Sequence, residues 1–451
     1  MKAFDWACAI WLFVSFAFPG VKMELPVMGG SPGSTTTGAN PYVAEAVAIL
    51  LAVWVLVGQR RRLVPFWVRG IAGIWIGAFV IAFAVGMLHG NSLRTTLTDL
   101  RYALLPVYLV VLSSVSRNAG ASVLRWGVSG FLCWAGVHAV LFAIEPTGFG
   151  NLHLVPLAVP TFVHDTSRMW LYPAMAMAAA LVGRNAFPRQ VGIVAVAAFF
   201  VLLSLIRGLW IAWPAAAIAG GLVAGVLGDL KAAFRFVSGQ VVGMAVGLLI
   251  TAAYLWLASS DGLFLLSFRI RSMGHAMHLT GPEPAVVEAP SWVSPTLRAI
   301  ARTGRLFHIR GAVGMVNEDA SMGDRGGMRD RALELFRESP ATGAGLGTTY
   351  RYKVSGAAWK EWNNPHNGYL WTLSKMGIVG ICLQGLCLLW AAAGLWAMRR
   401  SVAFVGCAVA IGVLFGLCEM LQCGLGMHCV VIPLAAIAVF RPGHDHPRHR
   451  P

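Results

Sequence analysis

The most constraining feature of this sequence is a succession of long apolar runs. Many of them approach the roughly 20 residues that a helix needs to cross the hydrocarbon core of a bilayer. Only 12% of the 451 residues are charged, against about 25% in soluble proteins. The sequence therefore predicts an all-α, polytopic membrane protein with about twelve transmembrane helices. The predicted spans are residues 3–19, 42–58, 70–88, 99–115, 124–144, 169–183, 188–206, 209–227, 237–258, 367–397, 402–418 and 424–440.

The arginine and lysine residues of the short loops predict the orientation. One set of alternate loops carries most of them, Arg60, Arg61 and Arg62 among them, whereas the opposite loops carry almost none. Because basic loops stay on the cytoplasmic side, both termini are predicted to be cytoplasmic and the long segment 259–365 to face outward. The predicted organisation is nine transmembrane helices, an outer helical loop domain, three further transmembrane helices and a cytoplasmic tail, in residues 1–258, 259–365, 366–440 and 441–451.

The formal net charge of +16 does not indicate a nucleic-acid partner, because much of it is this loop asymmetry. Three charged residues stand within or beside apolar runs: Glu45, Asp99 and Arg101. A charge in the membrane is costly, so each is expected to face a partner or a wet cavity. We expect Asp99 and Arg101 to be solvated near the outer boundary and to be structural.

Two arginine residues lie at the outer ends of predicted spans. Arg207 stands between two apolar runs in LLSLIRGLWIAW, with no acidic residue nearby in sequence. An arginine in that position either binds an anion or extends to the membrane surface for solvation, and the sequence supports both readings equally. Arg168 lies at the mouth of another span, where solvation is the favoured interpretation.

The outer segment 259–365 contains two recognisable helices. Ser294 and Pro295 begin the first one, which runs to His308 and places basic side chains on one face, as in a helix that lies on a membrane surface or on the protein beneath it. The second lies near residues 328–338. The glycine-rich stretch 343–347 follows that helix instead of preceding one, so it predicts a flexible loop and not a phosphate-binding loop.

The stretch NNPHNGYLWTLSKMGIVG, residues 363–380, opens the apolar run that follows this segment. Asn364 is a suitable N-cap and Pro365 a suitable first helical residue. His366 would then lie in the first turn, where the helix dipole favours the neutral imidazole that a general base requires.

These strings resemble the O-antigen ligase and polymerase superfamily. His366 and Asn367 are followed by nine residues and then by Gly377-Ile-Val-Gly380, which matches the ligase pattern in full. Arg325 precedes an Ala-Leu pair by seven residues, as in the family's loop motif, and Arg207-Gly208 corresponds to the family's Ser-Arg-Gly. The chain departs from the pattern twice, with Ile206 in place of the serine and Arg329 where the loop motif often has tryptophan.

The resemblance implies an inverting, metal-independent glycosyltransferase in the bacterial inner membrane. It would move a glycan from undecaprenyl pyrophosphate to a sugar hydroxyl of lipid A–core on the periplasmic side, with no cofactor. The resemblance makes His366 the candidate catalytic base. Arg207 and Arg325 become candidate ligands of the pyrophosphate, with Asn367 and Arg168 as further candidates for binding the glycan donor.

Two other functions fit parts of the sequence. A polymerase of the same superfamily would extend the lipid-linked glycan, but polymerases typically have two sizeable outer loops, and here 145–167 is short. A secondary transporter fits the predicted span count and the charges within spans. No internal repeat of the two halves is visible, however, and the largest polar segment faces outward.

Overall fold

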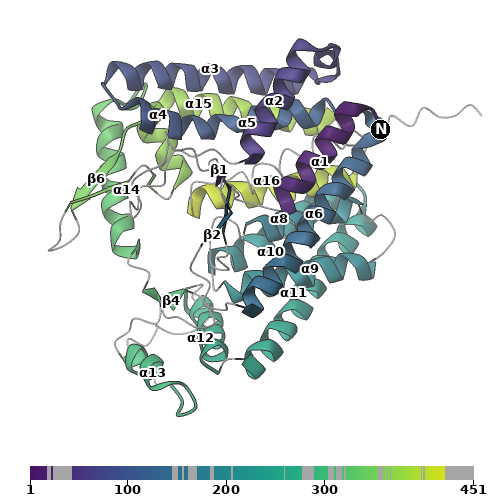
Figure 1. Cartoon of the computed structure of the whole chain (residues 1–451), viewed down its shortest axis with the longest axis vertical. Coiled ribbons are helices and arrows are strands. Elements are labelled where there is room, and N and C mark those ends of the chain that lie inside the picture. The colour runs from purple at the N-terminus through teal and green to yellow at the C-terminus, as the bar shows by residue number, and fades with distance from the viewer. Residues whose placement is uncertain are drawn as a thin grey trace, which may run out of the picture.

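The fold is a bundle of apolar helices with a smaller helical part at one end (Figure 1). The computed structural model describes residues 1–17, 22–23, 43–144, 151–154, 157–160, 170–182, 187–204, 207–258, 260–276, 289–302, 309–310, 317–318, 321–353, 359–362, 364–365, 367–397, 399 and 402–421.

The bundle helices follow the apolar runs of the sequence closely. They are α1 (Ala3–Ala17), α2 (Val43–Val57), η1 (Gln59–Leu63), α3 (Phe66–Leu88), α4 (Leu93–Asp99), η2 (Leu100–Ala103), α5 (Leu104–Ser113), α6 (Arg117–Ile144), α8 (Leu171–Val182), α9 (Phe187–Leu203), α10 (Arg207–Val226), α11 (Leu230–Ala258), α15 (Gly368–Ala397) and α16 (Val402–Leu421). By length and composition, five segments in the described part of the chain can cross a membrane, and four shorter helices are also apolar. Each predicted span before residue 421 overlaps one of these helices, except 99–115, which covers the end of α4, η2 and α5. The span at 424–440 lies outside the described residues.

The predicted span 99–115 differs from the observed one in its start and in its shape. The apolar segment begins at Leu93, because the Ser92 hydroxyl accepts a hydrogen bond from the Thr95 amide (3.2 Å) and caps α4. The chain then tightens into the 3₁₀ turn η2 before α5 continues. Asp99 and Arg101 therefore stand at a change of pitch inside the segment.

The smaller helical part contains α12 (Ser260–Ala276), α13 (Pro295–Arg302) and α14 (Ser321–Glu338). The Ser294 hydroxyl accepts a hydrogen bond from the Leu297 amide (3.3 Å), which confirms the predicted start of α13. The described helix ends at Arg302, short of the predicted end at His308. Leu297 and Ala301 are buried in a cluster with α12 residues such as Phe264, so α13 lies on protein. The second helix was predicted too short, since α14 begins at Ser321.

Three small antiparallel sheets, which the sequence did not predict, join parts of the chain. They contain β1 (Lys22–Met23), β3 (Leu157–Pro160) and β2 (Asn151–Leu154) in that order, β4 (Ile309–Arg310) with β5 (Asn317–Glu318), and β6 (Tyr350–Lys353) with β7 (Trp359–Trp362). The last hairpin pairs Tyr350 with Trp362 and leads the chain back to α15. Strands this short carry too little alternation to be recognised in a sequence.

Helix α15 is broken at Gly377, whose backbone has φ 62° and ψ −160°. A break in an apolar helix frees backbone groups that lipid cannot hydrogen-bond. Here residues 340–348, which we call the plug segment, supply the missing partners. The Ser374 and Lys375 carbonyls accept hydrogen bonds from the Ala344 and Gly345 amides at 2.8 and 3.0 Å.

The plug segment also satisfies the other side of the break. The Ile378 and Val379 amides donate to the Pro340 and Ala341 carbonyls at 2.9 and 3.0 Å. Farther along, the Leu346 amide donates to the Ala82 carbonyl of α3 (2.9 Å). The plug segment is thus wedged between α3, α4 and α15, with its own backbone completing the hydrogen bonding of a membrane helix.

The glycines of the plug segment are required by this fit. Gly343, Gly345 and Gly347 have φ values of 68°, 81° and 86°, which side-chain-bearing residues rarely adopt. A Cβ atom at Gly345 would collide with the backbone of Gly86, and one at Gly343 would collide with the backbone of α15. The prediction of a flexible loop is therefore wrong: the glycines serve close backbone approach.

Replacing Gly345 by alanine should destabilise the fold by roughly 2–4 kcal/mol, the combined cost of a left-handed alanine and an overpacked contact. The measurement is thermal unfolding of purified protein in detergent. Gly77→Ala is the matched control, because Gly77 lies in α3 with nothing within 4 Å of its Cβ position. Equal unfolding temperatures for Gly345→Ala and Gly77→Ala would contradict the tight fit of the plug segment.

Candidate functional site

The described residues contain only part of the predicted site. His366 and Arg168 lie outside them, and Arg207 and Arg325 are described only in their backbone, as the first residue of α10 and a residue of α14. Asn367 is described with its side chain: its Oδ1 atom accepts a hydrogen bond from the Leu370 amide at 2.9 Å. Asn367 is thus the N-cap of α15.

The predicted start of α15 is wrong by three residues, because the helix begins at Gly368 and not at Pro365. Asn364 and Asn367 are both suitable caps, and a sequence does not distinguish them. Asn364 has a different partner: its Nδ2 atom donates to the Tyr102 hydroxyl of η2 at 3.1 Å. In sequence, His366 therefore precedes the cap residue instead of following it.

Helix α14, which carries Arg325, packs against the first turns of α15. Ala332 and Leu335 on α14 form a buried cluster with Tyr350 of β6, and Leu370 of α15 packs against this cluster. Figure 1 shows α14 lying across the end of the bundle at which α15 begins. The helix of Arg325 and the helix start next to His366 are therefore neighbours.

Helix α10, which begins at Arg207, starts at the same end of the bundle. It runs antiparallel to α16, since Gly220 lies against Gly406 and Ala410 whereas Ala224 lies against Gly406. The start of α10 is thereby directed toward the C-terminal half of α16. The Tyr369 hydroxyl, in the first turn of α15, donates to the Gly416 carbonyl in that same half of α16 (3.1 Å). The fold thus directs the starts of α10 and α15 toward one end of the bundle.

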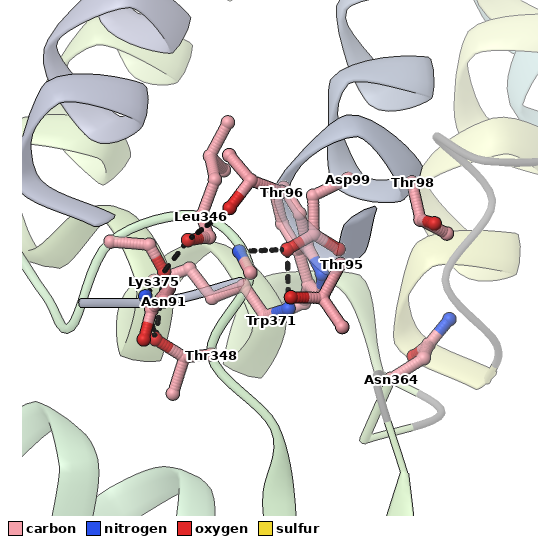
Figure 2. A network of polar contacts seen from close by, with 12 residues as sticks. Asn91, Thr95, Thr96, Thr98, Asp99, Leu346, Thr348, Asn364, Trp371 and Lys375 are labelled. Carbon is pink, nitrogen blue, oxygen red and sulfur yellow. Dashed lines mark hydrogen bonds and ion pairs between the residues drawn. The ribbon is translucent and has the colours of Figure 1, made fainter. Parts of the chain in front are cut away.

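A buried ion pair, which the sequence did not predict, lies two turns after the start of α15. Lys375 Nζ donates to Asp99 Oδ2 at 2.7 Å, and the two side chains are 1% and 2% exposed. The same carboxylate oxygen accepts a hydrogen bond from the Gly347 amide at 2.6 Å. Figure 2 shows the carboxylate of Asp99 facing the ammonium group of Lys375 beside the plug segment. The pair therefore joins α4, α15 and the plug segment.

Aromatic rings surround the ammonium group of Lys375. Its Nζ atom lies 5.5 Å from the ring centroids of both Tyr350 and Trp371, within the range of a cation–π interaction. The Tyr350 hydroxyl is 2.7 Å from the Ser374 hydroxyl. Ring faces and the Asp99 carboxylate thus replace water around this charge.

Asn91 holds the plug segment from the other side (Figure 2). Its Nδ2 atom lies within hydrogen-bond distance of the Ala344 and Leu346 carbonyls and of the Thr348 hydroxyl, at 3.2, 2.8 and 2.9 Å. The Thr96 hydroxyl also donates to the Leu346 carbonyl (3.3 Å). The contacts of Asn91 and Thr96 therefore fix the backbone of the plug segment.

The expectation that each charged residue in an apolar segment faces a partner is confirmed. Arg101 donates through Nε and Nη2 to Glu45 Oε1, both at 3.1 Å, and Asp99 pairs with Lys375. The expectation that Asp99 is solvated is wrong, because the residue is 1% exposed. A signal for Lys375 was available, since a lysine inside a 30-residue apolar helix needs a partner.

Removing one charge of this pair should destabilise the protein more than removing both. Asp99→Asn or Lys375→Met leaves a buried charge without its partner, which costs about 3–5 kcal/mol. The double variant Asp99→Asn/Lys375→Met should recover part of that loss in thermal unfolding experiments.

Glu334→Gln is the control, because Glu334 pairs with Arg331 at the surface (3.0 Å), where such pairs contribute about 0–1 kcal/mol. If the double variant loses as much as the two single variants together, the two charges do not stabilise one another.

Comparison with known proteins gives a match over the middle and later part of the chain. Residues 173–385 match the family model described as O-antigen ligase, a range that contains α10, α14, the plug segment and the first half of α15. No curated protein matches the chain. Residues 173–385, a little under half of the chain, are therefore similar to the O-antigen ligase family.

Proposed function

We propose that this protein is an O-antigen ligase: it transfers a glycan from undecaprenyl pyrophosphate to a sugar hydroxyl of lipid A–core. The observation that carries the proposal is the family match over residues 173–385, which contains every candidate residue except Arg168. The fold supports it, because it makes α14 and α15 neighbours and directs the start of α10 toward the same end of the bundle.

In the proposed reaction the acceptor hydroxyl attacks the anomeric carbon of the donor sugar from the face opposite the pyrophosphate. The carbon–oxygen bond to the pyrophosphate breaks, the configuration inverts, and the leaving group takes the electron pair. Arg207 and Arg325 stabilise its growing negative charge, since a guanidinium group presents permanent, paired donors to phosphate oxygens. His366 accepts the proton of the attacking hydroxyl. The reaction uses no metal or cofactor.

Asn367 and Arg168 have supporting roles in this scheme. The side-chain oxygen of Asn367 fixes the first turn of α15, so this residue places the helix start next to His366. Arg168 lies two residues before Trp170, which is 1% exposed in the bundle core. We assign Arg168 to binding of the glycan-pyrophosphate donor at the outer end of α8.

An apolar cavity of about 200 Å³ is large enough for a short stretch of the donor's lipid chain. It lies between α9, α10 and α11, and Trp210, Trp213 and Met244 are among its lining residues. The two indoles are held in place, because Trp210 Nε1 donates to the Val201 carbonyl (3.1 Å) and Trp213 Nε1 to Gln240 Oε1 (2.9 Å). Both tryptophans lie within two turns of Arg207, so a chain in the cavity would have its pyrophosphate near that residue.

The same scheme assigns the active site to the periplasmic face of the bacterial inner membrane and both termini to the cytoplasm. Silver-stained lipopolysaccharide from a deletion strain tests the ligase assignment. A ligase deletion loses the O-antigen ladder and accumulates lipid-linked polymer, whereas a polymerase deletion never makes the polymer. The second result would identify this chain as a polymerase.

Alanine and lysine substitutions at Arg207 and Arg325 should reduce transfer activity to different extents. Arg207→Ala and Arg325→Ala should each reduce transfer by reconstituted protein about 10²-fold or more, as the loss of one preorganised donor to a developing anion does. Lysine should restore activity only partly, because a point charge does not reproduce a planar fork.

Arg329→Ala is the control on the same helix as Arg325, since Arg329 is 64% exposed and pairs with Asp330. Near wild-type transfer by both alanine variants would refute the anion-binding role.

His366→Ala should lose turnover by about 10²–10⁴-fold, the typical contribution of a general base. His366→Gln should be nearly as inactive, because a carboxamide hydrogen-bonds to the acceptor but does not take its proton. Wild-type activity should fall toward acidic pH, since protonation of the imidazole removes the base. Transfer measured from pH 5 to 8 for the three proteins tests this role, and an active, pH-independent glutamine variant would disprove it.

A further inference from the structure

Tyr102 touches the chain on both sides of the candidate base. Its hydroxyl accepts the hydrogen bond from Asn364 Nδ2 (3.1 Å), two residues before His366. Its ring stacks on Trp371, five residues after His366, with the ring centroids 4.3 Å apart and an angle of 28° between the ring planes. One side chain of η2 therefore connects the end of the outer segment to the first turn of α15.

Tyr102 is itself firmly held. It is 9% exposed, and its carbonyl accepts a hydrogen bond from Trp75 Nε1 of α3 at 3.3 Å. The residue before it, Arg101, forms the ion pair with Glu45 of α2 (3.1 Å). Side chains of α2 and α3 thereby fix the position from which Tyr102 acts.

Two described residues between the contacts of Tyr102, Pro365 and Asn367, are held in place as well. Pro365 is buried and its ring fixes φ near −65°. Asn367 caps α15 through its side chain. The described residues on either side of position 366 are therefore held by Tyr102, by the proline ring and by the helix cap.

We propose that Tyr102 and Asn364 are positioning residues that hold the His366 segment in place for proton transfer. The inference rests on the proposed role of His366 as the base. A general base must lie within about 2.6–3.2 Å of the proton-bearing atom, and a displacement of about 1 Å costs up to 10²-fold in rate. A hydrogen bond two residues before the base therefore acts on turnover more than on substrate binding.

The test uses full-length protein in proteoliposomes with a lipid-linked glycan donor and purified lipid A–core. Tyr102→Phe keeps the ring stack and removes the hydrogen-bond acceptor, and Asn364→Ala removes the donor. Each should lower kcat about tenfold and leave KM within about twofold, as the loss of one positioning hydrogen bond predicts. The double variant should lose no more than either single variant, because both changes break the same bond.

Tyr369→Phe is the matched control. It also removes a tyrosine hydroxyl from the start of α15, and that hydroxyl donates to the Gly416 carbonyl of α16. Its kcat should stay within about twofold of wild type. Unfolding temperatures are measured for all variants, since a purely structural role for Tyr102 would lower the folded fraction and not the kcat of the folded protein.

The outcomes separate this inference from the proposed function. If His366→Ala loses transfer while Tyr102→Phe keeps its kcat, or if Tyr102→Phe changes KM alone, the positioning role is refuted and the base assignment stands. If His366→Ala keeps near wild-type transfer, the base assignment fails, and the positioning role fails with it. Additive losses in the Tyr102→Phe/Asn364→Ala double variant would also refute the shared hydrogen bond.

Discussion

The structure depends on how backbone hydrogen bonds are completed where an apolar helix is broken. In lipid, an unpaired amide or carbonyl costs several kcal/mol, so the kink at Gly377 is stable only because the plug segment pairs with both of its sides. That pairing fixes the end of α14 and the first turns of α15 relative to one another. The helix that carries Arg325 and the helix that follows His366 in the sequence are thus held together by main-chain contacts.

Charge secures the same junction from a second direction. The Asp99 carboxylate accepts from the Lys375 ammonium group and from the Gly347 amide at once, so one buried anion joins α4, α15 and the plug segment. A pair with both partners near 1% exposure contributes little net stability compared with an apolar pair of similar shape. The ion pair instead fixes the axial position of α15 relative to α4, because a shift of α15 along its axis would separate the two charges.

The positions of the bundle helices could be predicted from the sequence, because each helix that crosses a bilayer needs a long run of apolar residues. The junction could not, since it is made of backbone contacts between residues far apart in the chain. Gly343 and Gly345 looked like loop residues because a sequence shows the freedom of glycine but not the surface that approaches it. Asn364 and Asn367 are equally suitable helix caps by residue type. In the structure Asn364 donates to the Tyr102 hydroxyl, whereas Asn367 caps α15. The family motif makes His366 a candidate, whereas Tyr102 carries no recognisable signal in the sequence.

The buried ion pair has a consequence for how the protein is made. Asp99 and Lys375 are 276 positions apart, and at about 5–20 residues per second a ribosome needs roughly 14–55 seconds to bridge that interval. During this time the carboxyl group of Asp99 has already been delivered with its segment, while the lysine that neutralises it has not been synthesised. The nascent chain therefore needs a temporary solution for this group: a protonated carboxyl, water near the headgroups or shelter in the insertion machinery. The arrival of α15 closes the ion pair and completes the hydrogen bonding at the helix break together.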